Sequence, residues 1–421
     1  MNGTKHIGIT YFFAILTQFV GAQTCEQHEH SYPFLRCGDN EIKHKGRSSE
    51  KFEFFYEKLL KLQVHGTGCL NILHFGDSHI QADHLPNRMR QLLLGDQTAW
   101  SEGDRGVIFP FTVAKTNNPH SYIVDYSGEW SSVRNVKSDG SENLGLTGMS
   151  ISTSDPSAML KITQPQTGYV TSSFTSIRVF HSVGQNVPKI LLGQSDNLMF
   201  QTTNESRGYT LFGLKESMDS LSIVFDFNFV ELASSVEKNA TQEISIYGIS
   251  LESGNAGSTY SALGVNGARV KDLLKSNLLE KQLSVVEPSL IILSYGTNDV
   301  YQNFNPSEFR KNYTTLIRRI RSELPHVPIL LTTPGDALKD RTQPIKELPQ
   351  LIKIIHDVAK ANDCAVWDFY TVMGGKGSIN EWFQANLANS DNLHFIKKGY
   401  ELQADLLFQA LIQNYLNTIK N

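Results

Sequence analysis

Residues 70–78 read LNILHFGDS, an apolar run followed by glycine, aspartate and serine. The run is typical of a short buried strand, and the residues after it, as far as Leu94, have apolar side chains at helical spacing. A strand that passes through a tight turn into a helix begins an α/β unit. This stretch therefore predicts a sheet with helices on its faces and places Ser78 at the end of a strand.

The α/β pattern returns after Gly254. Apolar strands and helices alternate there, with the strands expected at 290–295, 328–332 and 365–369 and the helices at 268–283, 307–324, 348–362 and 397–419. Another helix is expected over 48–64, ahead of the first strand. Strands that alternate with helices predict a parallel sheet covered on both faces, which is a three-layer α/β/α arrangement.

The sequence between residues 113 and 253 has a different texture. Serine, threonine, asparagine and glycine are frequent, and strand-like runs occur at 176–180, 189–192, 221–226 and 243–249. Short strands separated by turn residues predict an all-β sandwich or jelly roll. We therefore expect one α/β domain in two parts, interrupted by a β module and preceded by an N-terminal region. The expected bounds are 23–66 for the N-terminal region, 67–112 and 254–421 for the α/β domain, and 113–253 for the module.

The first 22 residues are expected to lie outside the fold. Lys5 precedes an apolar run over 7–20, and two small residues follow it, which is the pattern of a secretory signal peptide cleaved after Ala22. The run is short for a bilayer span, so an uncleaved anchor is the weaker alternative. The mature chain is expected to be secreted or periplasmic, without a transmembrane segment.

Composition excludes two classes of protein. The 421 residues include 38 Lys and Arg against 42 Asp and Glu, a formal charge of −4, which does not suit a polybasic nucleic-acid binder. Hydrophobic residues make up 40% of the chain, enough to bury a core, so the chain is not disordered. The oligomeric state stays open.

The four cysteines give no sign of a metal site. Cys25 and Cys37 lie close together in a polar segment, where an exported protein could join them, but the sequence leaves that pairing open. Cys69 and Cys364 each come just before an expected strand and are predicted to be free and buried. Neither a CxxC nor an HExxH pattern occurs, so no metal and no cofactor are expected.

Ser78, Asp391 and His394 are the residue types of a serine hydrolase. Ser78 lies where a strand turns into a helix, beside N–H groups that can stabilise developing negative charge. Asp391 precedes His394 by three positions, so its carboxylate can orient the imidazole that takes the serine proton. Taken alone, each segment is also explained by helix capping or loop chemistry.

Two further segments supply hydrogen-bond donors near strand ends. The Asn298 amide, directly after the strand LIILSY, could donate to an oxyanion, and such a donor is worth roughly 3 kcal/mol in the transition state. Gly267, ahead of another expected helix, could offer a backbone N–H and a close approach for substrate. Both residues also fit ordinary turns.

In this order along the chain, the four segments resemble the SGNH (GDSL-type) hydrolase family. The resemblance implies a flavodoxin-like α/β/α fold and a catalytic set of Ser78, His394 and Asp391. It also implies an oxyanion hole formed by the N–H groups of Ser78 and Gly267 and the amide of Asn298. His79 and His84 are expected to be exposed residues at the start of a helix, with a place in the lining of the site as the weaker alternative.

The first block reads GDSHIQAD instead of GDSL, and the β module follows it. In both respects the sequence is similar to bacterial peptidoglycan O-acetylesterases, which carry a carbohydrate-binding-like jelly roll here. The resemblance implies an esterase that removes O-acetyl groups from a glycan, most of all peptidoglycan, through an acetyl-enzyme on Ser78. Three alternatives stay open: an acetylesterase of xylan or a host glycan, a polysaccharide O-acetyltransferase, and a carbohydrate-binding protein without activity.

Overall fold

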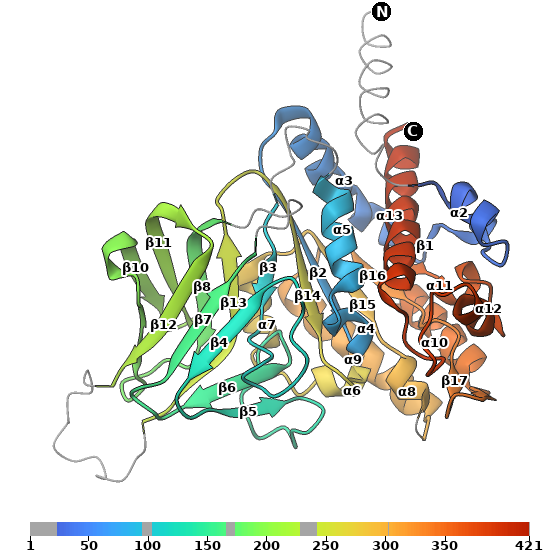
Figure 1. Ribbon diagram of the computed structural model, residues 1–421. Helices are drawn as coiled ribbons and strands as arrows, with labels where there is room; N and C mark the ends of the chain where they lie inside the picture. Colours follow the sequence, from blue (N-terminus) through green and yellow to red (C-terminus); the bar gives the residue numbers. More distant parts are fainter. Residues whose placement is uncertain (1–22, 95–102, 166–172, 228–241, 302, 421) are drawn as a thin grey trace, which may run out of the picture.

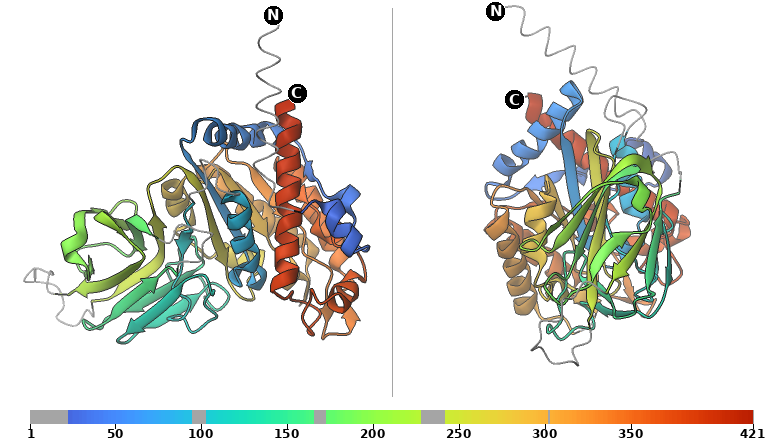
Figure 2. Two further views of the ribbon diagram at one scale, coloured as in Figure 1. Left: turned by 45° about the horizontal axis from the view of Figure 1, so that its top comes forward. Right: turned by 90° about the vertical axis from the view of Figure 1, so that its left-hand side faces the viewer.

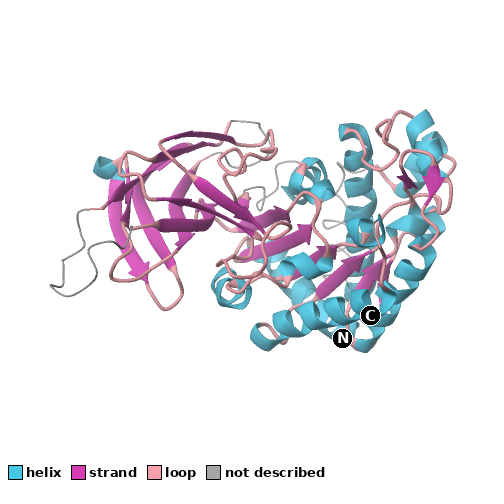
Figure 3. Ribbon diagram, turned by 90° about the horizontal axis from the view of Figure 1, so that it is seen from below, coloured by secondary structure: helices cyan, strands magenta, loops and turns pink. Residues whose placement is uncertain are grey.

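A computed structural model describes residues 23–94, 103–165, 173–227, 242–301 and 303–420. The expected signal peptide, 1–22, lies outside the described residues. The chain forms two bodies side by side, a sheet flanked by helices and a body of antiparallel strands (Figure 1). Figure 3 shows the same division from below.

Within the described residues, the sheet of the α/β domain has six strands in the order β1-β19-β16-β15-β2-β14. Their bounds are Ile42–His44 (β1), Cys69–Gly76 (β2), Gly257–Gly264 (β14), Leu290–Ser294 (β15), Ile329–Thr332 (β16) and Ala365–Trp367 (β19). All neighbours pair in parallel except β1, which joins β19 antiparallel. The sheet is therefore mixed, because the N-terminal region adds an antiparallel edge to the parallel sheet that the sequence predicts.

Side chains of successive residues in these strands enter different cores. In β2, Ile72 packs in one apolar cluster, whereas Leu73 and Phe75 pack in the other. The first cluster includes residues of α3 (Ser48–His65), α5 (His84–Leu94) and α13 (Lys397–Lys420). The second includes residues of α6 (Val270–Leu273), α7 (Leu279–Val286), α9 (Pro306–Glu323) and α10 (Leu348–Ala361). The strands are apolar on both sides because helices cover both faces.

Two expected helices are interrupted. The helix predicted to follow Ser78 without a break is divided into α4 (Ser78–Gln81) and α5, and Asp83 between them has a φ of +60°. The helix predicted over 268–283 is divided into α6 and α7. The shorter elements of the domain are α8 (Thr297–Tyr301), α11 (Phe369–Val372), α12 (Ser378–Gln384), β17 (Leu338–Lys339) and β18 (Gln343–Pro344). In the described part of the chain, no helix is long and apolar enough to span a membrane.

The β module consists of antiparallel sheets. Among its described residues, one sheet has the order β10-β11-β8-β13-β6-β5, with β3 also paired to β13, and the other has the order β4-β7-β12-β9. The bounds are Gly106–Ile108 (β3), Ile123–Ser127 (β4), Ser131–Arg134 (β5), Met149–Thr153 (β6), Met159–Thr163 (β7), Phe174–His181 (β8), Lys189–Leu192 (β9), Leu198–Asn204 (β10), Tyr209–Met218 (β11), Ser220–Asp226 (β12) and Ile244–Glu252 (β13). A short 3-10 turn, η2 (Ser195–Asn197), precedes β10. An α/β sheet combined with antiparallel β sheets is the fold class that the sequence predicts.

The module joins the α/β domain through paired strands. Strand β3 pairs with β13 and also packs against β14, so the chain enters and leaves the module along neighbouring strands. One apolar cluster extends from Ile151 in the module to Leu73 in β2. The left view of Figure 2 shows the module beside the α/β domain, on the side where β14 forms the edge of the central sheet, and α13 packs against α5.

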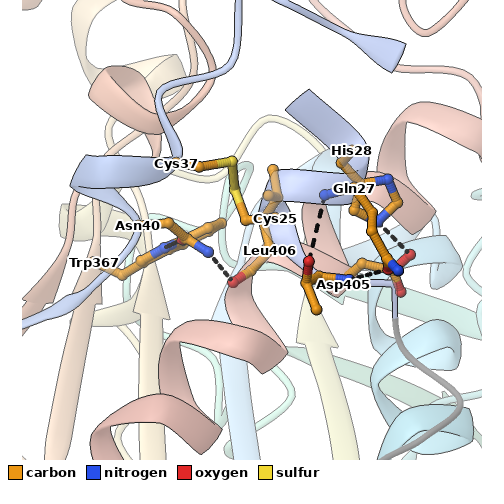
Figure 4. The surroundings of a disulfide bond; sticks show 9 residues. Cys25, Gln27, His28, Cys37, Asn40, Trp367, Asp405 and Leu406 are labelled. Atoms are coloured by element: carbon orange, nitrogen blue, oxygen red, sulfur yellow. Dashed lines mark hydrogen bonds and ion pairs between the residues drawn. A yellow bond between two sulfur atoms is a disulfide. The ribbon is translucent and has the colours of Figure 1, made fainter. Parts of the chain in front are cut away.

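A disulfide closes a loop within the N-terminal region, and Asn40 beside it donates to the Leu406 carbonyl of α13 (Figure 4). It joins Cys25 in α2 (Cys25–Ser31) to Cys37 in η1 (Cys37–Asp39), so the pairing that the sequence left open is present. Cys364 is free and buried as expected, but Cys69 is free and exposed because it begins β2 at the sheet margin.

Candidate active site

The carboxyl ends of three neighbouring strands bring the candidate residues together. Ser78 follows β2 at the start of α4, Gly267 follows β14, and Asn298 lies in α8 after β15. His394 lies in the loop that precedes α13, and this loop returns to the same edge of the sheet as Ser78. Because ligands of open parallel sheets bind outside the carboxyl ends of the strands, this edge is where a site is expected.

Ser78, His394 and Asp391 form a continuous line of hydrogen bonds. Ser78 Oγ lies 2.9 Å from His394 Nε2, and His394 Nδ1 lies 2.8 Å from Asp391 Oδ2. The other carboxylate oxygen of Asp391 accepts the backbone N–H groups of Leu393 and His394 at 3.0 and 2.9 Å. Desolvation raises the pKa of Asp391, but these hydrogen bonds outweigh it and hold the pKa below its usual value. The carboxylate therefore stays ionised beside the imidazole.

Asp77 connects the serine turn to Asn298. One Asp77 oxygen accepts the His79 backbone N–H at 3.0 Å, and the other accepts Asn298 Nδ2 at 2.9 Å. Asn298 Nδ2 also donates to the Ala268 carbonyl at 3.2 Å, so the amide reaches the Gly267 segment as well. Burial raises the pKa of Asp77 to about 6. From the sequence, Asp77 is only a helix cap, and its contact with Asn298 was missed.

Gly267 occupies the third position of a tight turn. Ala268 N–H donates to the Val265 carbonyl at 2.9 Å, and Gly267 has a φ of +82°, as the third residue of a type II turn requires. A Cβ added at Gly267 would meet no atom within 4 Å, so the glycine faces open space. Its position depends on backbone conformation rather than on side-chain packing.

His79 is not the exposed residue that the sequence predicts. It is half-buried, its ring stacks on that of His394, and its Nδ1 lies 3.0 Å from the Tyr400 hydroxyl. His84 is also half-buried and stacks on Tyr400. The expectation fails because Tyr400 belongs to α13, which packs against α5 and covers both histidines.

The site contains polar and titratable groups suited to acyl transfer. In the described residues, no group of three or more His, Cys, Asp or Glu side chains is placed to hold a metal ion. A hydroxyl, an imidazole and an ionised carboxylate in sequence can activate an oxygen nucleophile and then protonate a leaving group.

Comparison with known proteins places these residues in a class. Residues 247–402 match the GDSL-like Lipase/Acylhydrolase family, a range that includes Gly267, Asn298, Asp391 and His394. This part of the chain therefore corresponds to a GDSL-type acylhydrolase domain. Ser78 lies outside the matched range, on the part of the domain before the β module. None of the curated proteins compared with the chain matches it.

One solved structure extends the likeness to most of the fold. A peptidoglycan O-acetylesterase is similar over 89% of this chain and 99% of its own, with a TM-score of 0.71 and 22% identity. A lipase/acylhydrolase from Enterococcus faecalis covers 37% of this chain and 75% of its own, with 27% identity and a TM-score of 0.30. A carbohydrate esterase family 3 protein from Talaromyces cellulolyticus covers 44% and 79%, with 16% identity and a TM-score of 0.30.

Proposed function

We propose that the protein is a secreted serine esterase that removes O-acetyl groups from a glycan, with Ser78 as its nucleophile. The observation that carries the proposal is the hydrogen-bonded line from Ser78 Oγ through His394 to Asp391. A hydroxyl, imidazole and carboxylate in this order activate a serine for attack on an ester. The proposal refines the ester hydrolase class to which the GDSL-type domain belongs.

In the first half-reaction, Ser78 Oγ bonds to the acetyl carbonyl carbon while His394 Nε2 takes the hydroxyl proton. The carbonyl electrons move to its oxygen, which accepts hydrogen bonds from the N–H groups of Ser78 and Gly267 and from the Asn298 amide. Because that amide donates to Asp77 and Ala268 in the free protein, one of these bonds gives way to the oxyanion. The ester C–O bond then breaks, and His394 returns the proton to the departing sugar oxygen.

In the second half-reaction, water replaces the sugar. His394 takes a proton from the water as its oxygen bonds to the acetyl carbon, and the same donors stabilise the second oxyanion. The bond to Ser78 Oγ breaks, the serine regains its proton from His394, and acetic acid leaves and ionises to acetate in water. Asp391 stays ionised and stabilises the imidazolium in both steps.

Peptidoglycan is the substrate that we propose first. In support, the likeness to the solved peptidoglycan O-acetylesterase covers 89% of this chain, so it takes in the β module as well as the hydrolase domain. The expected signal peptide would deliver the enzyme outside the cytoplasm, where such polymers lie. Acetylated xylan or a host glycan would use the same catalytic residues, and a transferase would use a sugar hydroxyl in place of water.

The test is acetate release from O-acetylated peptidoglycan, acetylated xylan and 4-nitrophenyl acetate. We expect Ser78→Ala and Asp391→Asn to lower kcat by more than about a thousandfold, because the nucleophile or the orienting carboxylate is lost. Ser322→Ala, an exposed serine on α9, is the matched control and should leave kcat unchanged.

The outcomes separate the alternatives. Undiminished turnover by Ser78→Ala would refute the serine mechanism. Acetate release from xylan but not from peptidoglycan would change the substrate, and acetyl transfer to added oligosaccharide that outpaces hydrolysis would make the protein a transferase. Wild-type protein that releases no acetate from any of the three esters would refute the proposed activity.

A further inference from the structure

Gln81 connects three segments beneath the candidate site. Its side chain belongs to α4, the helix that begins at Ser78, and the residue is only 2% exposed. Gln81 Oε1 accepts the Asn266 backbone N–H at 2.7 Å, and Nε2 donates to Thr116 Oγ1 at 3.1 Å and to the Asn117 carbonyl at 2.9 Å. Both N–H groups and the oxygen of this buried amide are therefore engaged, which fixes its orientation.

The turn that Gln81 contacts is the one that contains Gly267. Asn266 and Gly267 are the two central residues of the Val265–Ala268 turn, which is closed by the Ala268 N–H bond to the Val265 carbonyl. The turn starts from a fixed point, because Val265 N–H donates to the Gly76 carbonyl at 3.1 Å. Its tip has no such backbone bond, and there the Gln81 oxygen holds Asn266 N–H.

Thr116 and Asn117 accept the hydrogen bonds of the Gln81 side-chain nitrogen. They belong to the segment that leads from β3 into the β module, and Thr116 Oγ1 also accepts Asn266 Nδ2 at 3.3 Å. The Val265–Ala268 turn is therefore held between α4 and the segment that contains Thr116 and Asn117. The close packing of these parts shows at Gly264, where an added Cβ would lie 2.2 Å from Gln81 N.

We propose that Gln81 is a positioning residue, which fixes the Gly267 N–H of the oxyanion hole relative to Ser78. The inference rests on the proposed function, because it assumes that Gly267 donates to the reacting ester. An oxyanion donor contributes only when it is held at hydrogen-bond distance from the developing charge. A hydrogen bond from α4 to the turn fixes that distance, since Ser78 and Gln81 lie on the same short helix.

The matched control is Gln282 in α7. It is 1% exposed, and its Oε1 accepts the Leu146 backbone N–H at 2.8 Å across a similarly long stretch of chain. Gln81→Met and Gln282→Met therefore each remove one buried amide that binds a distant backbone N–H. A purely structural role for Gln81 predicts similar losses of stability and of turnover for the two variants.

The kinetic test uses 4-nitrophenyl acetate and inhibition by phenylboronic acid, whose tetrahedral serine adduct resembles the oxyanion. For Gln81→Met we expect kcat to fall about tenfold and the boronate to bind about tenfold more weakly, with little change in KM. Gln282→Met should retain kcat and boronate affinity. Equal kcat in Gln81→Met and wild type, or an equal loss in Gln282→Met, would overturn the proposal.

Amide hydrogen exchange gives a readout that does not depend on turnover. We expect exchange in the 265–268 segment to accelerate in Gln81→Met and to stay unchanged in Gln282→Met. Unchanged exchange in Gln81→Met would overturn the positioning role even in an active enzyme. Wild-type protein that hydrolyses no ester would refute the proposed function, and accelerated exchange would still support the anchoring of the turn.

Discussion

The ring of His79 stacks on the ring of His394, with centroids 5.1 Å apart and an angle of 29° between the planes. Burial, together with the neighbouring His394, lowers the pKa of His79 to about 3. His79 is therefore neutral near pH 7. The stack supports the His394 imidazole from the side, and the Tyr400 hydroxyl, 3.0 Å from Nδ1, orients His79 in turn.

The stack predicts that His79→Ala lowers kcat by about tenfold, because the His394 ring gains freedom to leave the line to Ser78. The affinity for substrate should change little, so KM is expected to stay within about twofold. His84→Ala, which removes a neighbouring ring that contacts Tyr400 and not His394, is the control. Equal kcat losses in the two variants, measured with 4-nitrophenyl acetate, would show that the stack has no special role.

The raised pKa of the Asp299 carboxyl predicts that the folded protein loses stability as the pH rises. Desolvation raises the pKa of its carboxyl to about 7, and the nearby Asp272 and Asp77 carboxylates act in the same direction against the Val270 N–H. The folded protein thus holds the Asp299 proton more tightly than the unfolded chain, whose carboxyl has an ordinary pKa near 3.8. The stabilising contribution is full below that ordinary value and is lost as the pH rises through about 7.

Asp299→Asn has no proton to lose at this position. Its Tm should exceed that of the wild type by about 3 °C near pH 8, and the difference should be clearly smaller near pH 5. Thermal unfolding at the two pH values, with the exposed Asp125→Asn as control, tests this. A gap between Asp299→Asn and wild type that is the same at both pH values would contradict it.

The disulfide predicts a stability effect that is separate from catalysis. Cys25 and Cys37 are 12 positions apart, and a loop of that size stabilises a fold by about 3 kcal/mol. Close to the disulfide, Asn40 Nδ2 donates to the Leu406 carbonyl at 3.0 Å, halfway along α13 (Figure 4). Cys25→Ser with Cys37→Ser should therefore lower Tm by roughly 5 °C.

Turnover of the double variant at 25 °C should stay near the wild-type value, because Ser78, Asp391 and His394 belong to other segments. Cys69→Ser, which removes a free thiol, is the control for loss of cysteine and should leave Tm unchanged. A double variant with the Tm of the wild type would contradict the expected loss of stability. A double variant that is folded but inactive would contradict the expectation that the disulfide does not affect turnover.

The sequence predicted the fold and the order of the candidate residues because those depend on local patterns. LNILHF and LIILSY are apolar on both sides, and the polar residues after them identify the carboxyl edge of the sheet. Strand β14 was missed because GSTYSALG has few apolar residues, yet it pairs with β2 along its whole length. These residues form a strand because they pair with β2, and pairing between distant segments cannot be recognised from a local sequence pattern.

The supporting residues of the site were missed for a similar reason. Gln81 and His79 have no distinctive spacing, and their partners Asn266, Thr116 and Tyr400 lie far away in the sequence. The division of the first helix was also unexpected, because Asp83 takes a φ of +60° where its carboxylate binds Arg90 at 2.9 Å. Contacts between distant segments determine these positions.

The passage from β13 through residues 253–256 into β14 limits how such a protein can change during evolution. The strand that closes the module continues into the strand that ends at the Gly267 turn, and β3 pairs with β13 where the chain enters. A foreign module spliced in at this site would have to reproduce the β3–β13 ladder to keep that turn in register with Ser78. Exchange of modules among such hydrolases should therefore preserve this pair of strands and vary the distal ones.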